Sequence, residues 1–176
     1  MNLELESKLV KKYPKSFRDI YSDPKKSCMA FGCDHGDGWY SILNAAFSSL
    51  KDKYDRYITD MDTSNSTLIK YHIPHVVAKQ IKEKYGRLVI YWDLSFPRAF
   101  TRLCKKYPKT MDKIITEFYG YIDGVIRMAE QVSVVTCEEC GNPGSLCTTS
   151  GDYRGWHKTL CPICEKKYNY KKLKKS

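Results

Sequence analysis

Apolar side chains recur at every third or fourth position in two long stretches of the chain, and this spacing predicts two amphipathic helices. The first stretch runs from Trp39 to Tyr54, and the second runs from about residue 111 to residue 131. Both stretches carry charged residues on the opposite side, so each helix should pack one face against a core. The residues expected in this core are Trp39, Leu43, Leu50, Ile90, Phe118, Ile122 and Ile126.

The remaining segments predict shorter elements. Residues 1–20 show helical spacing that a proline interrupts, and residues 75–84 are interpreted as a short helix between a proline and a glycine. The run 88–92 is β-branched and aromatic, which favours a strand. Residues 22–38 and 94–110 contain several glycines or prolines and are expected to be irregular. Together these elements predict an α+β fold, with a few helices around a small sheet.

The strongest chemical signal is a pair of Cys-x-x-Cys motifs near the C-terminus. Cys137 and Cys140 form the first motif, and Cys161 and Cys164 form the second after twenty intervening residues. Each motif directs two thiolates to one point, and four thiolates complete a closed tetrahedral site of the kind that Zn²⁺ fills. Because no position stays open for a substrate, the zinc is expected to be structural. Cys147 lies between the motifs and is interpreted as a free thiol.

The chain is therefore expected to have three parts: an α+β body over residues 1–131, a zinc ribbon over residues 132–165 that docks on the second long helix, and a basic tail rich in Lys and Tyr over residues 166–176. The formal net charge is +10, and the tail supplies much of that excess. Such a charge favours polyanionic partners.

Basic residues mixed with aromatic residues flank the second Cys motif and suit phosphate contacts combined with base stacking. Two other interpretations stay open here: a protein partner, or a solvated charge run in which Trp156 packs over the zinc loop. The candidate nucleic-acid contacts are Arg154, Trp156, Lys158, Lys171, Lys172 and Lys174.

A glycine-rich loop precedes the first long helix and holds a second candidate site. His35, Asp37, Gly38 and Trp39 are its candidate pocket residues. Three interpretations stay open: Asp37 or Gly38 caps the helix, the loop and the helix N-terminus bind an anion or a nucleotide, or the loop forms a second metal or catalytic site. A catalytic site would use Asp34, His35 and Asp37.

Other chemical motifs are weak or missing. His72 and His75 could share a metal, although the proline between them favours an extended segment. The sequence shows no nucleophile elbow, no phosphate-binding Gly-Lys-Ser loop and no HExxH motif. It also shows no signal peptide and no apolar run of about 20 residues, so we expect a protein of a reducing cytosol with no membrane partner.

Five motifs occur in order along the chain and together resemble a known family. They are Gly-Asp-Gly-Trp-Tyr at 36–40, Ile-Lys-Glu-Lys-Tyr-Gly-Arg-Leu at 81–88, Gly-Val-Ile-Arg-Met-Ala-Glu at 124–130, Cys-Glu-Glu-Cys-Gly-Asn-Pro-Gly at 137–144 and Gly-Trp-His-Lys-Thr-Leu-Cys at 155–161. The sequence resembles the small, mostly uncharacterised zinc-ribbon proteins that tailed bacteriophages and prophages encode. The basic tail and the segment from Asp93 to Pro108 depart from that family.

The resemblance implies a protein that acts in the cytoplasm of a bacterial host during infection. Three functions are consistent with it. The first is a non-enzymatic accessory protein that binds nucleic acid, or a nucleic-acid machine, through the zinc ribbon and the tail. The second is a counter-defence protein that inhibits a host immune protein or sequesters its nucleotide signal in the 32–40 loop. The third is a small hydrolase built on that loop.

Overall fold

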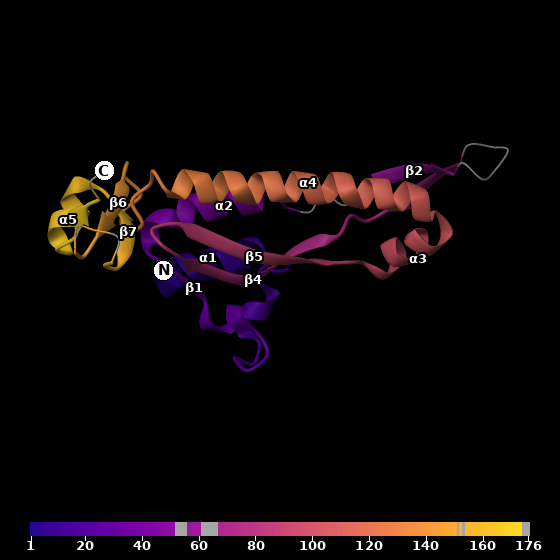
Figure 1. Ribbon diagram of the computed structural model, residues 1–176. Coiled ribbons are helices and arrows are strands. Elements are labelled where there is room, and N and C mark those ends of the chain that lie inside the picture. Colours follow the sequence, from indigo (N-terminus) through magenta and orange to yellow (C-terminus); the bar gives the residue numbers. More distant parts are fainter. Residues whose placement is uncertain (52–55, 61–66, 151, 153, 174–176) are drawn as a thin grey trace.

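The longest helix, α4 (Pro108–Ser133), runs along most of the length of the molecule, and the other elements are arranged beside it or at its two ends (Figure 1). The N-terminal elements and the main sheet lie along its C-terminal half, and the cysteine-rich segment follows that end directly. A helical hairpin and a β-hairpin lie at the opposite end. The computed structural model describes residues 1–51, 56–60, 67–150, 152 and 154–173.

The main sheet has three strands. Strand β4 (His75–Glu83) is central, with β1 (Cys33–Asp34) parallel on one edge and β5 (Leu88–Ser95) antiparallel on the other. Helices α2 (Tyr40–Ser49) and α4 pack against each other, and α4 also packs on β5. The described chain confirms the α+β fold class.

The remaining elements of the body are short. The N-terminal helix α1 is followed by three single-turn 3-10 helices. The hairpin β2–β3 and helix α3 lie at the end of α4 opposite the cysteine-rich segment (Figure 1). Their bounds are α1 Leu3–Lys12, η1 Arg18–Tyr21, η2 Cys28–Phe31, η3 Asp37–Trp39, β2 Arg56–Asp60, β3 Thr67–Tyr71 and α3 Arg98–Lys106.

The main core lies between α1, α2, α4 and the three-stranded sheet. Six of the seven predicted core residues are buried in it, and Phe118 is only partly buried at its edge. The predicted helix from Trp39 to Tyr54 is confirmed as α2 from Tyr40 to Ser49, while Tyr54 lies outside the described residues.

The prediction of a helix over residues 75–84 is wrong, because this segment is the central strand β4. Three consecutive residues, Val76, Val77 and Ala78, are buried, and the next buried residue is Ile81. The strand pairing shifts between Ala78 and Gln80, which marks a β-bulge. An extra residue in a bulge breaks the alternation of a strand, and the resulting spacing of three resembles that of a helix.

The prediction of an irregular segment over residues 94–110 is also wrong, because this segment contains α3. Pro97 is the N-cap residue of α3 and Pro108 is the first residue of α4. Proline suits the first turn of a helix, where its missing N–H has no partner to lose. Both prolines therefore begin helices here instead of interrupting one.

A second, smaller core joins α3 to α4 and β3, and it buries Phe100 and Met111 completely. The C-terminal segment forms its own three-stranded sheet in the order β7-β6-β8, with helix α5 between β7 and β8. Among the described residues, no helix is long and apolar enough to cross a membrane. The bounds of the C-terminal elements are β6 Ser145–Thr148, β7 His157–Leu160, α5 Pro162–Lys167 and β8 Lys171–Lys172.

Candidate metal centre and its docking surface

The four predicted cysteines converge on one point. The Sγ atoms of Cys137, Cys140, Cys161 and Cys164 all lie within 4.8 Å of one another, so together they could hold a metal ion. Three of these side chains are buried and Cys140 is exposed. Cys147 is buried beside the cluster but is not part of it, and its thiol donates to the carbonyl of Ser145 at 3.3 Å.

Tight turns aim the thiols at this point. In the first motif, the N–H of Gly141 donates to the carbonyl of Cys137 at 2.9 Å, and Gly141 has a positive φ of 77° that a residue with a side chain rarely adopts. In the second motif, the N–H of Cys164 donates to Sγ of Cys161, which lowers the pKa of the Cys161 thiol to about 7. Burial raises the pKa of Cys137 and Cys164.

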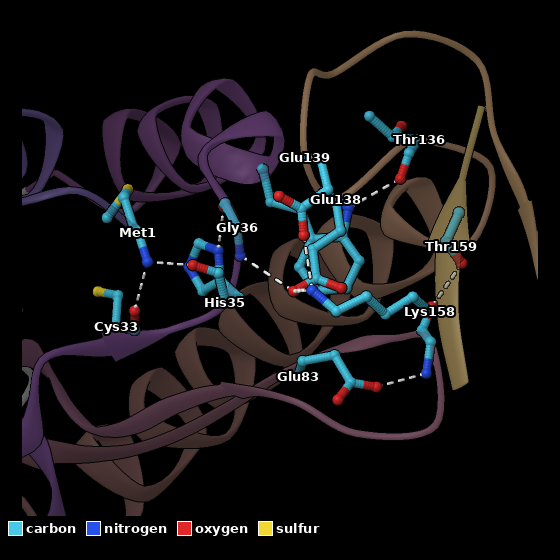
Figure 2. A network of polar contacts seen from close by, with 12 residues as sticks. Met1, Cys33, His35, Gly36, Glu83, Thr136, Glu138, Glu139, Lys158 and Thr159 are labelled. Atoms are coloured by element: carbon cyan, nitrogen blue, oxygen red, sulfur yellow. Dashed lines mark hydrogen bonds and ion pairs between the residues drawn. The ribbon is translucent and has the colours of Figure 1, made fainter. Parts of the chain in front are cut away.

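The glycine-rich loop, which was a candidate pocket, packs against the first cysteine motif (Figure 2). The N–H of Gly36 donates to a carboxylate oxygen of Glu138 at 3.0 Å, and the N–H of Gly38 donates to the Glu138 carbonyl at 2.7 Å. The indole N–H of Trp39 donates to the carbonyl of Thr136 at 2.8 Å. Three N–H donors of the loop therefore bind the C-terminal segment that holds the four cysteines. We call this segment, residues 136–173, the metal module, or simply the module.

Gly38 allows this close approach. A Cβ atom at Gly38 would lie closer than 3.0 Å to three backbone atoms, the carbonyl oxygen of Cys137 and the nitrogens of Cys140 and Gly141. Backbone atoms cannot rotate away as the end of a side chain can, so glycine is required here for steric reasons.

The other loop residues are also engaged by the protein. His35 is buried, with Nδ1 2.7 Å from the carbonyl of Gly36, and burial lowers the pKa of its imidazole to about 4. The interpretation that Asp37 or Gly38 caps the following helix is wrong, because the N-cap residue of α2 is Trp39. The carboxylate of Asp37 instead accepts hydrogen bonds from the backbone N–H and the side chain of Asn2 at 2.7 and 2.6 Å. Asp34, the third residue of the hypothetical hydrolase site, is exposed on β1.

The turn between β4 and β5 forms a second contact with the module. The hydroxyl of Thr159 on β7 donates to the carbonyl of Gly86 at 2.6 Å, and the N–H of Gly86 donates to Glu83 at 2.5 Å (Figure 2). The carbonyl of Thr159 accepts from the N–H of Glu138 at 2.8 Å, so β7 connects the turn to the first cysteine motif.

The C-terminal end of α4, which leads into the module, is fixed to the start of β5. Ser133 is fully buried and its hydroxyl accepts from the N–H of Leu88 at 2.9 Å, while Glu130 pairs with Arg87 at 3.3 Å. These hydrogen bonds fix the end of α4 to β5 only a few residues before Cys137. The module is therefore joined to the body by a short connection that begins at a fixed point.

Lys158 belongs to this junction. Its ammonium group lies 2.6 Å from Glu139 and 3.3 Å from Glu138, and Glu138 is almost completely buried. Burial opposes charge on Lys158, but the hydrogen bond to Glu139 and the two carboxylates outweigh it and raise its pKa. Burial also raises the pKa of Glu138. Lys158 therefore pairs within the module, and one of its partners is Glu138, which accepts from Gly36 in the docking contact.

The other candidate nucleic-acid contacts are on the outside of the module. The side chain of Trp156 is 80% exposed, and Arg154 is exposed while it pairs with Asp152 at 2.6 Å. Lys171 and Lys172 are exposed on β8, which pairs with β6, so this part of the basic segment is folded onto the module. Lys174 lies outside the described residues.

The five sequence motifs meet at the junction between the body and the module. The sequence alone did not predict that these motifs contact one another. Local spacing identified the cysteines, but it carried no signal that residues 36–39 contact Glu138, about a hundred positions away. Within the described ranges, His72 and His75 join no group of three or more metal-binding side chains.

No protein-family model matches this sequence, and no curated protein or solved structure is detectably similar to it.

Proposed function

We propose that this chain is a non-enzymatic accessory protein of a bacteriophage that binds single-stranded nucleic acid in the bacterial cytoplasm through its C-terminal module. The observation that carries the proposal is the exposed indole of Trp156, at 80% exposure, at the outer end of a hairpin that the cysteine site closes. The phage origin and the cellular location rest on the motif resemblance described above.

The metal in this proposal is a structural Zn²⁺. Four thiolates form a closed ligand set, and soft sulfur ligands in a tetrahedral arrangement suit Zn²⁺ better than Mg²⁺ or Ca²⁺. The ion would replace the hydrophobic core that so short a segment lacks, since the core around the cysteines contains few apolar side chains besides Leu160 and Tyr170.

An exposed tryptophan beside a strand of the module suits base stacking. Packing within the fold does not account for the indole of Trp156, because most of its surface is in contact with solvent. Arg154 lies two residues before it, and Lys171 and Lys172 are exposed on the same small sheet. Aromatic rings that stack on bases, combined with cations that contact phosphates, are the usual means of binding single strands without sequence preference.

The geometry of the 36–39 loop favours a binding protein over an enzyme or a nucleotide-binding pocket. The donors that would contact an anion there already bind Glu138 and Thr136. Counter-defence activity and hydrolysis therefore remain hypotheses from the sequence that no contact in this loop supports.

The test is a titration of metal-loaded protein into a fluorescent single-stranded oligonucleotide of mixed sequence. Stacking contributes about 1–3 kcal/mol per base, so Trp156→Ala should weaken binding by roughly 5- to 150-fold. The control is Tyr21→Ala, which removes an aromatic ring that is 82% exposed on η1 in the body and should leave binding unchanged. The proposal fails if the wild-type protein shows no binding at low salt, or if Trp156→Ala binds as the wild type does.

A further inference from the structure

Helix α3 presents a strongly basic face at the end of the molecule opposite the cysteine module (Figure 1). Residues 98–113 contain six Lys or Arg and a single acidic residue, Asp112. The sequence predicts an irregular segment over residues 94–110, so the basic face became visible only when the structure showed a helix there. Its exposed cations are Arg98, Arg102, Lys105 and Lys106 on α3, and Lys109 and Lys113 at the start of α4 continue the basic segment.

The apolar side of α3 is already occupied. Phe100 is fully buried against Tyr71 and Met111, and Leu103 and Cys104 are partly buried in the same cluster. The basic side must therefore face solvent. Because the apolar side packs within the protein, α3 has no free hydrophobic face to insert into a lipid surface, which a membrane-binding amphipathic helix requires.

Five of the six cations of this face are not neutralised within the described part of the chain. Within the described part of the chain, Arg98, Arg102, Lys105, Lys109 and Lys113 make no ion pair. Elsewhere, several exposed cations do pair with carboxylates: Lys8 with Glu4, Arg127 with Asp123, and Arg154 with Asp152.

This arrangement also opposes helix stability. Arg98 and Arg102 are four residues apart, and like charges at that spacing destabilise a helix by about 0.2–0.5 kcal/mol per pair. Arg98 is also in the first turn, where the helix dipole disfavours a positive charge, while only Lys105 and Lys106 in the last turn are favoured by it. The charges of Arg98 and Arg102 therefore do not stabilise the helix, which favours a role for them in binding a ligand.

We infer that the basic face of α3 is a second nucleic-acid contact surface, one that binds phosphates of the strand whose bases stack on the module. A row of exposed cations, five of which make no ion pair among the described residues, suits backbone phosphates and carries no base specificity. The inference rests on the proposed function only for the class of ligand, because its evidence lies on a separate surface.

The two surfaces are separated by the length of α4. This helix has 26 residues, which at 1.5 Å per residue is about 39 Å. A stacked strand advances about 3.4 Å per nucleotide, so roughly 12 nucleotides are needed to reach from one surface to the other. A strand of about 8 nucleotides should therefore contact only the module, while a strand of about 30 nucleotides should contact both surfaces.

The test compares the double variant Arg102→Glu/Lys105→Glu with a control of equal charge change, Lys25→Glu/Lys26→Glu. The control lysines are exposed in the loop before η2 and make no ion pair among the described residues. For a single strand of about 30 nucleotides, the α3 variant should bind at least about tenfold more weakly than the control at low salt. The plot of log K against log salt has a negative slope. For the α3 variant this slope should be less steep than for the control by about 1.4, which corresponds to two lost phosphate contacts.

Each outcome separates the two proposals. If the α3 variant binds the long strand as the control does, with the same salt slope, the inference about α3 is overturned even when Trp156→Ala binds weakly. If the α3 variant loses affinity while Trp156→Ala does not, the α3 surface is supported and the proposed function of the module fails. If the wild-type protein binds no oligonucleotide at low salt, both fail. Equal thermal unfolding midpoints would show that the variants remain folded, as expected for exposed positions.

Discussion

Replacing Gly38 by alanine tests whether the 36–39 loop is the docking surface of the metal module. The added methyl group would lie closer than 3.0 Å to three backbone atoms of the first cysteine motif. The φ angle of Gly38 is not in the left-handed region, so alanine adds no backbone strain of its own. The whole effect should therefore come from the contact with the module.

The expected loss of stability is large. Overpacking by a methyl group usually costs about 1–3 kcal/mol when side chains can adjust, but here the neighbours are backbone atoms. Relief requires the module to move away, which would break the hydrogen bonds from Gly36, Gly38 and Trp39, each contributing about 1 kcal/mol. We expect Gly38→Ala to lower the free energy of unfolding by about 3 kcal/mol or more, and to expose Trp39, which is now fully buried.

The assay is urea unfolding of the metal-loaded protein followed by tryptophan fluorescence. The matched control is Gly124→Ala in the middle of α4, where a Cβ atom would have no neighbour within 4 Å. Alanine is a better helix former than glycine, so this control should stabilise the protein by about 0.5–1 kcal/mol. A Gly38→Ala protein within about 0.5 kcal/mol of the wild type would refute the docking interpretation.

Two further predictions concern the junction and the metal. Because burial lowers the pKa of His35 to about 4 while the unfolded chain takes up this proton near pH 6.5, stability should fall as the pH drops from 6.5 towards 4. Between pH 7 and pH 5, protonation of His35 in the unfolded chain should lower the free energy of unfolding by about 2 kcal/mol. Urea unfolding of His35→Gln should therefore depend on pH more weakly by that amount, and an unchanged pH dependence would contradict the assignment to His35. Cys140→Ser should release zinc to a chelator much more readily than the wild type, whereas Cys147→Ser should retain it. A colorimetric zinc dye measures the release, and equal retention by both variants would contradict the ligand assignment.

The features that the sequence predicted well are those with local causes. The cysteine cluster follows from two short motifs, and the 26-residue helix α4 follows from an apolar repeat that runs from about residue 111 to residue 131. The error at β4 arose because a bulge between Ala78 and Gln80 replaces the alternation of a strand with helical spacing. The error at α3 arose because Pro97 and Pro108 occupy the starting positions of helices, which a simple count of helix-breaking residues cannot recognise.

The features that the sequence could not predict depend on distant partners. The sequence makes Gly38 and Trp39 candidate pocket residues, because a glycine-rich loop beside a helix N-terminus can bind an anion. In the structure these two residues and Gly36 donate to the cysteine module instead. Their actual partners, Glu138 and Thr136, are about a hundred residues away. Lys158 is a candidate nucleic-acid contact in the sequence because its positive charge is visible there. Its two carboxylate partners, Glu138 and Glu139, are visible only in the structure.

Amide hydrogen exchange of the metal-loaded protein, with and without a saturating single-stranded oligonucleotide, tests most directly where this protein binds its ligand. We predict slower exchange around Trp156 and Lys172 on the module and in residues 98–109, with no change in residues 36–40, whose donors already bind the module. Protection concentrated in residues 36–40, or no protection on the module, would contradict the proposed function.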